Sequence, residues 1–388
     1  MTTTASLITP LRSHRPLLVA TVLSLAVAAA ATIGLFVDSR ELVGAPIWLK
    51  AWKFGVSIAI YTVTIAWMLA ALPGRSRWTW WLGTVIAVCI SVENVLIVLQ
   101  IVRGSMSHFN FRTPFDSTVF VTMGIAIVLV WLANLFLGII LGVRPLASPS
   151  LTAGVRWGVA VSLVGMAMAF LMTVGGLGVI DAPGGGIEGA HTVGALDGGP
   201  GMPVTGWSTV AGDLRVPHFV GIHALQALPL FTLFLARLAG RLPLIRGERT
   251  RVRLAHIAGP TALGVVVLLT WQAARGQSVA QPDAATIVTA SALLTTAAAS
   301  VAWVLWRETK RRVDVLVPSA DAAEYGRAPF AWVHTESHAP AHHPREPSRP
   351  PGQAVPNQEE HGCDEDEPHR GSAHDRSGPS ARLDVPLV

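Results

Sequence analysis

Lysine, tyrosine, cysteine and charge in general are scarce in this sequence. Its 388 residues include only two cysteines, and only 14% of them are charged. Cys89 lies in an apolar stretch and Cys363 in a polar one, so nothing suggests the disulfide framework of a small secreted domain. The P-loop, the dinucleotide-binding glycine fingerprint, HExxH and GxSxG are also missing. None of the common soluble catalytic motifs therefore supports an enzyme, and a non-enzymatic role is favoured.

Apolar residues are abundant instead, at 51% of the sequence. They form eight runs of about 20 residues, the length needed to cross roughly 30 Å of hydrocarbon as a helix. The first run is too long for a signal-peptide core, so we expect an uncleaved helix. The predicted fold class is all-α, a polytopic membrane bundle of eight helices. We expect the spans near residues 16–36, 46–72, 79–102, 117–142, 153–179, 217–240, 254–274 and 284–306.

The arginines occupy alternate connections between these runs. The chain has a formal charge of +5, which is compatible with nucleic acid as a partner. We exclude that partner, because basic residues in short loops between apolar runs mark the cytoplasmic side of a membrane protein. The predicted orientation places both termini in the cytoplasm, with the lipid bilayer as the expected environment. The arginine-rich connections hold Arg12 and Arg15, Arg75 and Arg77, Arg144 and Arg156, Arg237 to Arg253, and Arg307 to Arg312.

Rare residues recur at a nearly constant offset along the chain. Pro46 recurs as Pro217, the set Gln100, Arg103 and Gly104 recurs as Gln272, Arg275 and Gly276, and Trp131 recurs as Trp303. With four helices per unit, both units would enter the membrane from the same side, as in a parallel repeat. We therefore expect an N-terminal segment at 1–15, one four-helix half at 16–142 and a second at 143–306.

Two segments lie outside the predicted helices. The glycine-rich loop 181–215 is either a mobile lid or a linker, and a linker is favoured. The segment 307–388 is rich in proline, histidine and charge, as in a disordered cytoplasmic tail. Its histidines have spacings that suit a metal, yet Pro340 and Pro344 would prevent the helix needed to align them. We expect no metal site among His334, His338, His342, His343 and Cys363.

Ionisable side chains inside the membrane are functional candidates by default. Counted from Pro46, Lys50 lies about 6 Å and Lys53 about 10 Å along the second span, while Glu93 lies near mid-membrane in the third. An ionised carboxylate there costs at least about 2.5–3.5 kcal/mol, so Glu93 needs a proton, water or a partner. The two lysines are the expected partners. The alternative is a buried ion pair that only fixes helix register.

Further polar residues are expected at the same, outer end of the bundle. The loop RGSMSHFNFRTPFD carries aromatic residues that could tuck it between helices, and the sixth span opens with VPHFVGIHALQ. Three polar groups in the outer half of that span suggest a lined cavity. The full set of predicted ligand-binding or proton-coupling residues is Lys50, Lys53, Glu93, Gln100, Arg103, His108, Asn110, His218, His223, Gln226, Gln272 and Arg275.

The segments PIWLKAWKFGVSIAIY, QIVRGSMSHFNFRTPFD and VPHFVGIHALQ together resemble an uncharacterised family of bacterial multi-spanning membrane proteins, over roughly residues 40–306. The sequence departs from the family pattern at Ala51, where the family has proline. The resemblance implies a bacterial cytoplasmic (inner) membrane protein. It implies no substrate, cofactor or activity.

The favoured function is a transporter or ligand-binding protein for a small polar or anionic solute, because the predicted site has a positive balance. One alternative is a redox protein in which histidines on facing helices ligate haem. Another is a membrane-embedded enzyme acting on a lipid intermediate, with Glu93 or His223 as general base. In the last alternative, a structural protein, the polar residues would only fix packing.

Overall fold

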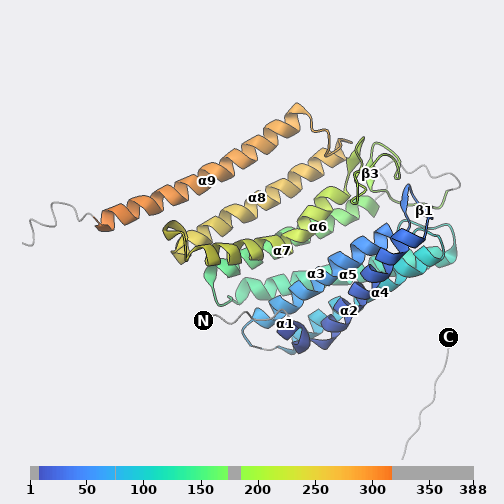
Figure 1. Ribbon diagram of the computed structural model, residues 1–388, viewed down its shortest axis with the longest axis horizontal. Helices are drawn as coiled ribbons and strands as arrows, with labels where there is room; N and C mark the ends of the chain where they lie inside the picture. Colours follow the sequence, from blue (N-terminus) through green and yellow to red (C-terminus); the bar gives the residue numbers. More distant parts are fainter. Residues whose placement is uncertain (1–7, 75, 174–184, 317–388) are drawn as a thin grey trace, which may run out of the picture. The chain divides into compact units, whose positions relative to one another are not determined.

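The protein is an all-α bundle, as the sequence predicts. The computed structural model describes residues 8–74, 76–173 and 185–316 (Figure 1). Eight of its helices are long and apolar enough to cross a membrane. The helices are α1 (Ile8–Ser13), α2 (Arg15–Val37), α3 (Leu49–Ala71), α4 (Arg77–Val102), α5 (Pro114–Val143), α6 (Pro149–Thr173), α7 (Arg215–Leu238), α8 (Glu248–Ala274) and α9 (Ala284–Leu316).

Strands are almost absent from the described residues. One two-stranded hairpin pairs β1 (Glu41–Leu42) with β2 (Ala45–Pro46), and β3 (Thr192–Val193) pairs with β4 (Gly212–Asp213). A short 3₁₀ turn, η1 (Pro243–Ile245), precedes α8.

All eight predicted spans are helices at the expected places. The tail is the exception, because α9 continues past the predicted end at residue 306.

Side chains that face outward from the long helices are apolar. Phe36, Phe136 and Leu230 are exposed on α2, α5 and α7, as are many valines and isoleucines along the other spans. Such continuous apolar surface is unfavourable in water but matches the hydrocarbon of a bilayer. Together with eight apolar helices of membrane length, it makes this chain an integral membrane protein.

The helices pack in two similar groups. Helix α2 packs against α3 and α4, and α4 against α5, while α6 packs against α7 and α8, and α8 against α9. The groups meet where α5 contacts α6 and α3 contacts α7. In each group the first helix contacts the second and third, and the third contacts the fourth, as expected for a parallel four-helix repeat. A shared origin of the two halves stays a prediction.

Glycines set the closest helix crossing in the second group. Gly165 of α6 and Gly221 of α7 face each other, and a Cβ added at Gly165 would lie 2.5 Å from the Gly221 Cα. Small residues that let backbones approach are the usual basis of helix association in membranes. Gly165 and Gly221 therefore permit the close contact between α6 and α7.

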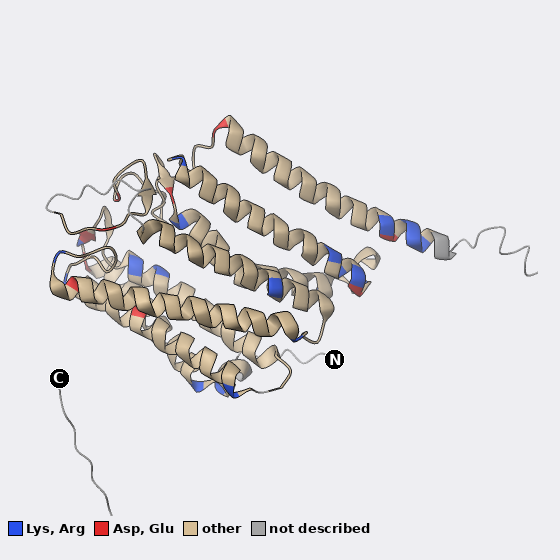
Figure 2. Ribbon diagram, turned by 180° about the vertical axis from the view of Figure 1, so that it is seen from behind, with Lys and Arg blue, Asp and Glu red and all other residues tan. Residues whose placement is uncertain are grey.

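The connections gather at two ends of the bundle. We call the loop end the one formed by segments 38–48, 103–113, 185–214 and 275–283, and the basic end the one formed by 72–74, 144–148 and 239–247. Figure 2 shows charged residues concentrated toward the helix ends, with the long spans between them almost free of charge. At the loop end, contacts such as Ser278 Oγ to the Ser208 carbonyl (2.7 Å) join segments far apart in sequence.

The described part of the glycine-rich loop, residues 185–214, is folded onto the loop end. Its backbone pairs with the α4–α5 loop, where the Phe111 N–H donates to the Gly186 carbonyl (2.7 Å). Gly212 packs against the backbone of Ala273 in α8 so closely that a Cβ would overlap it. The linker interpretation is therefore wrong for these residues, because their backbone polar groups are paired with the rest of the bundle. The predicted tail from residue 317 onward, with its histidines, lies outside the described residues.

Candidate functional site

Lys50 lies in the first turn of α3, which begins at Leu49, and Lys53 lies at the start of the second turn. They are thus closer to the loop end than a count from Pro46 predicts, by about 4 Å. The Lys53 ammonium donates to the Thr205 carbonyl (3.0 Å) in the folded loop. The Lys50 ammonium lies 5.8 Å from the centre of the Phe54 ring and forms no hydrogen bond with another described residue. Cations at a helix N-terminus oppose the helix dipole, which favours anions there.

The Glu93 side chain is buried at mid-helix in α4 and is only 2% exposed. Neither carboxyl oxygen has a hydrogen-bond partner among the described residues. The predicted ion pair with the lysines is not formed: Lys53 is occupied by Thr205, and Lys50 acts on Glu93 only across a longer distance. A charged carboxylate without a partner in this place would be costly. Glu93 is therefore a buried acid whose carboxyl oxygens form no hydrogen bond with the described residues.

Gln100 and Arg103, at the loop end of α4, are held by one carboxylate. Asp116 accepts from Gln100 Nε2 (2.8 Å), from Arg103 Nη1 (2.7 Å) and from the Thr113 hydroxyl (2.7 Å). Gln100 Nε2 also donates to the Met106 carbonyl (3.2 Å). These groups close the turn between α4 and α5. They were predicted as ligand-binding residues, but Gln100 Nε2 and Arg103 Nη1 donate their hydrogen bonds within the protein.

Gln272 and Arg275 repeat this arrangement at the end of α8. Gln272 Nε2 donates to the carbonyl six residues ahead, at Ser278 (3.0 Å), as Gln100 does to Met106. Arg275 bridges Asp283 (3.0 Å) and Thr286 (2.9 Å) at the start of α9. The two predicted pairs therefore occupy equivalent turns in the two groups of helices. Both are turn-closing residues rather than lining of a shared mouth.

The α4–α5 loop is anchored by a single aromatic residue. Phe109 is 3% exposed, adopts a left-handed backbone (φ 62°) and packs among Met172, Val193 and Leu214. Gly189, with φ 119°, makes room, because a Cβ there would lie 2.5 Å from the Phe109 ring. The predicted tucking of this loop between helices is confirmed for Phe109, and it ties the first group of helices to the second.

The anchored loop fixes His108 beside aromatic rings. The His108 ring lies 6.1 Å from those of Phe54 and Phe109 and 6.2 Å from that of Phe120, measured between centroids. Burial holds the pKa of His108 well below its usual 6.5, and the nearby positive charge of Lys50 acts in the same direction. His108 is therefore neutral at physiological pH. Asn110, next in the loop, donates to Ser105 (2.9 Å) and Met106 (3.2 Å) and supports the loop itself.

Two acid–base pairs at the loop end were missed from the sequence. His191 contacts Asp197 (2.6 Å), and Arg215 contacts Asp213 (2.6 Å). Burial acts to raise the pKa of Asp197, but hydrogen bonds from His191 and Thr192 hold it well below its usual range. The sequence does contain a signal for the first pair: a histidine and an aspartate lie six residues apart within a glycine-rich loop. Loops often carry functional residues, so this pair was a candidate.

The three polar residues predicted on α7 have different surroundings. His218 bonds through Nδ1 to the Gly165 carbonyl of α6 (2.8 Å), so it joins the two helices. His223 lies edge-on to Phe219, with 4.3 Å between ring centroids. The Gln226 carbonyl oxygen is buried without a partner among the described residues. The predicted cavity lined by all three is therefore not formed as one group, although His218 lies close enough to His108 and His191 to influence both electrostatically.

The remaining residues converge from both groups of helices. A Cβ placed on Gly206 would lie 4.0 Å from Lys53 Nζ and 4.0 Å from Arg215 Nη1, so cations from α3 and α7 approach one point. Lys50 acts electrostatically on both Glu93 and Asp197. Two lysines and one arginine thus face two paired carboxylates and one unpartnered acid. We call this set the loop-end cluster: Lys50, Lys53, Glu93, His108, His191, Asp197, Asp213, Arg215 and His218.

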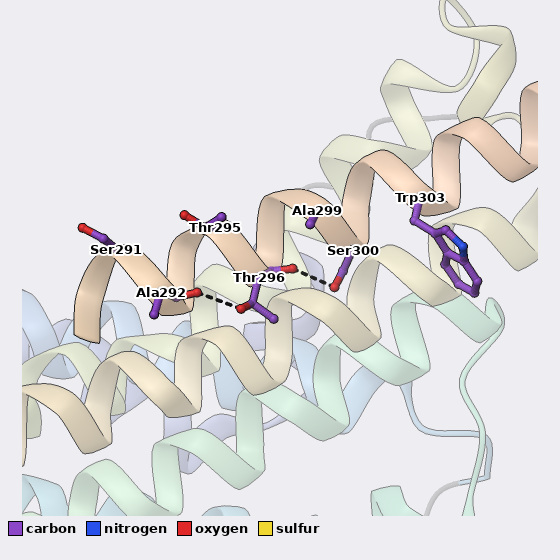
Figure 3. A pocket seen from close by; sticks show the side chains of 7 residues that line it. All are labelled: Ser291, Ala292, Thr295, Thr296, Ala299, Ser300 and Trp303. Atoms are coloured by element: carbon purple, nitrogen blue, oxygen red, sulfur yellow. Dashed lines mark hydrogen bonds between the residues drawn. The ribbon is translucent and has the colours of Figure 1, made fainter. Parts of the chain in front are cut away.

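The cluster offers hydrogen-bond donors rather than a metal cage. Within the described residues, no three His, Cys, Asp or Glu side chains come together as metal ligands. Two hollows lie elsewhere on the molecule. One of them runs along α9 past Ser291, Thr295 and Trp303 (Figure 3). Its Thr296 and Ser300 hydroxyls donate to carbonyls of their own helix (2.8 and 2.7 Å), so that face has little polar capacity left for a ligand.

The fold defines a class: a helical integral membrane protein. Comparison with protein-family models, curated proteins and solved structures gave no match to this chain. The predicted family resemblance stays a prediction.

Proposed function

We propose that the protein binds a small anionic solute at the loop-end cluster and carries it across the membrane. The observation that carries this proposal is the convergence of Lys53 and Arg215, from two different groups of helices, on one point near Gly206. Like charges this close repel each other unless an anion lies between or beside them. Asp213 forms its ion pair with Arg215, and it acts on Lys53 only as a longer-range attraction.

Lys50 is the residue best placed to contact the solute. It lies in the first turn of α3, where the free backbone N–H groups and the helix dipole also favour an anion. The N-cap residue of α3, Trp48, provides no side-chain cap. Because Lys50 has no hydrogen-bond partner among the described residues, its three donors are open to a ligand.

Glu93 supports coupling to protons. A neutral carboxyl buried in a membrane helix can release its proton when a cation or water reaches it, and such residues mark proton relays in transporters. Lys50 is the cation within electrostatic range of Glu93. Binding of an anion by Lys50 would weaken that influence, so that the charge on Glu93 and the occupancy of the site would depend on each other.

The proposed location is the bacterial cytoplasmic membrane, with the basic end in the cytoplasm. The excess of arginine at that end supports this orientation. The cluster would then face the outside, where it could collect solute.

Binding is testable with the full chain in detergent. Thermal unfolding would be followed with chloride, phosphate, sulfate, acetate and glutamate, each at increasing concentration. An anion that binds the folded protein raises the unfolding temperature in proportion to the logarithm of its concentration above Kd. We expect one of these anions to stabilise wild type, and Lys50→Met to remove that stabilisation.

Lys310→Met is the matched control, because it also removes one lysine but lies in α9, where its ammonium covers the Trp306 ring (4.6 Å). It should keep the full response to the anion. Equal responses from Lys50→Met and wild type, or no specific response to any of the five anions, would contradict the proposal.

A further inference from the structure

A second hollow lies between α6 and α8 at the basic end, the end of the bundle opposite the loop end. Its volume is about 550 Å³, and its lining includes Leu146, Arg156, Trp157, Val252 and His256. Apolar and basic side chains thus share one opening. Nothing in the proposed solute site requires this feature.

Arg156 of α6 is held at one side of the hollow by a contact with the neighbouring helix α5. Its Nε donates to the Leu141 carbonyl (2.9 Å) at the end of α5. The two terminal nitrogens form no hydrogen bond with another described residue, and the side chain is exposed. A guanidinium fixed through Nε presents its two outer N–H groups as a fork, the geometry that suits a phosphate.

His256 supplies a second donor, and its orientation is fixed by Trp157. The indole Nε1 of Trp157 lies 3.0 Å from His256 Nδ1. An indole N–H can only donate, so Nδ1 is the acceptor and the neutral imidazole carries its hydrogen on Nε2. The free donor of His256 is therefore Nε2–H. Gly259 keeps this pair in place, because any Cβ there would overlap the Trp157 ring.

The hollow lies about two helical turns from the starts of α6 and α8. Arg156 is about 10 Å from the start of α6, and His256 about 12 Å from the start of α8. Both helices, with 25 and 27 residues, exceed the roughly 20 residues needed to cross the hydrocarbon, so their ends project beyond it. Arginine and tryptophan at such a level are typical interfacial contacts.

We propose that this hollow is a binding site for the phosphodiester headgroup of an anionic phospholipid. Arg156 and His256 would hold the phosphate oxygens, while the apolar lining around Leu146 and Val252 would contact the first part of an acyl chain. Charge complementarity favours an anionic lipid over a zwitterionic one, since Arg156 and Arg249 place positive charge near the starts of α6 and α8. The apolar lining favours a lipid over free phosphate. The site is independent of the loop-end cluster.

The test uses the full chain in detergent, with retention of added lipid measured by native mass spectrometry. Dioleoyl phosphatidylglycerol is the probe, dioleoyl phosphatidylcholine has the same chains with a zwitterionic headgroup, and inorganic phosphate lacks the chains. We expect wild type to retain phosphatidylglycerol preferentially. In Arg156→Gln, affinity should fall roughly tenfold, because a charge-assisted pair of hydrogen bonds is lost. Trp157→Phe, which frees the His256 tautomer, should show a smaller loss.

Arg253→Gln is the matched control, because it removes the same charge from an exposed position of α8 that does not line the hollow. It should bind phosphatidylglycerol like wild type. Equal losses in Arg156→Gln and Arg253→Gln would overturn the proposal in favour of diffuse surface attraction. Equal retention of phosphatidylcholine, or full competition by inorganic phosphate at the same concentration, would also overturn it. Should Arg156→Gln fail to fold, Arg156→Lys keeps the charge but not the fork, and it too must weaken binding.

Discussion

At the scale of single residues, Asp116 decides how the α4–α5 turn is held. It is buried and accepts hydrogen bonds from Gln100, Arg103 and Thr113. Asp283 has a similar task at the α8–α9 turn, where it accepts from Arg275, but its side chain is 44% exposed. Each aspartate therefore accepts hydrogen bonds that close a turn between two helices, but Asp116 is buried and Asp283 is exposed.

Asp116→Asn should lower the free energy of unfolding by about 1.5–3 kcal/mol, since it turns charge-assisted hydrogen bonds into neutral ones around a buried arginine contact. Asp283→Asn should cost clearly less, because the pair is exposed and asparagine still caps a helix well. Thermal unfolding of both variants in the same detergent measures the difference. Equal losses would show that burial does not govern these turns.

His108 gives the loop end a pH dependence. Burial holds its folded-state pKa well below 6.5, whereas the unfolded chain takes up a proton near 6.5. The unfolded state therefore binds more protons below that pH, and stability is lost as the pH falls through about 6.5, by at most about 1.4 kcal/mol per pH unit for one proton.

His108→Phe should remove that part of the loss, because phenylalanine has no proton to bind and the site is already lined by aromatic rings. The measurement is the change in unfolding temperature between pH 7.5 and pH 5 for the variant and for wild type. Other histidines contribute equally to both proteins, so the difference isolates His108. An identical change in both would contradict the assignment.

The sequence predicted the site in part. Lys50, Lys53, His108 and His218 lie toward one end of the bundle, and Glu93 lies deeper, at mid-helix in α4. The ion pair between Glu93 and a lysine was wrong, because the folded loop supplies Thr205 as the acceptor for Lys53. No helical periodicity could reveal that partner, since it depends on the path of a glycine-rich segment 152 residues away in sequence.

At the scale of elements, the crossing of α6 and α7 is the tightest test of packing. Gly221→Ala would place a methyl group against the backbone of Gly165, where no flexible side chain can move aside. We expect a loss of about 1–3 kcal/mol from overpacking. Gly124→Ala, in α5, is the matched control because no atom lies within 4 Å of its added Cβ.

The control should be neutral or slightly stabilising, since alanine has the better helix propensity by about 1 kcal/mol. Chemical or thermal unfolding of both variants measures the pair. Should Gly221→Ala prove as stable as Gly124→Ala, the close approach of α6 and α7 would not be needed for the fold.

All eight long helices were predictable because each is a continuous apolar run of sufficient length. The helix starts were less exact: α5 begins at Pro114 and not near residue 117, because Thr113 caps it by accepting from the Asp116 N–H (3.1 Å). The start of α3 was placed too early, since Pro46 belongs to a short strand and not to the helix. The folded part of the glycine-rich loop was missed because its order comes from contacts with α3, α8 and the α4–α5 loop, and not from local periodicity.

At the scale of the whole molecule, the orientation in the membrane follows from the distribution of arginine. With Cys363 replaced by serine, the only remaining natural cysteine is Cys89, which is buried. Single cysteines introduced at Gln281, at the loop end, and at Arg241, at the basic end, are both exposed.

A membrane-impermeant maleimide should label Gln281→Cys in intact cells, and Arg241→Cys only after the membrane is permeabilised, because the basic end is expected in the cytoplasm. The reverse pattern would invert the topology and turn the loop-end cluster toward the cytoplasm.

The central claim is that anions cross the membrane through the loop-end cluster, with Lys50 as their contact and Glu93 as the proton site. The most direct measurement is the current from proteoliposomes adsorbed to a solid-supported membrane after a jump in the concentration of the anion that stabilises the protein. Wild type and Lys310→Met should give a saturable current that depends on the pH gradient. Lys50→Met should give none, and the current of Glu93→Gln should no longer respond to the gradient. A current in Lys50→Met equal to that of wild type, or no wild-type current above that of empty liposomes, would contradict the account.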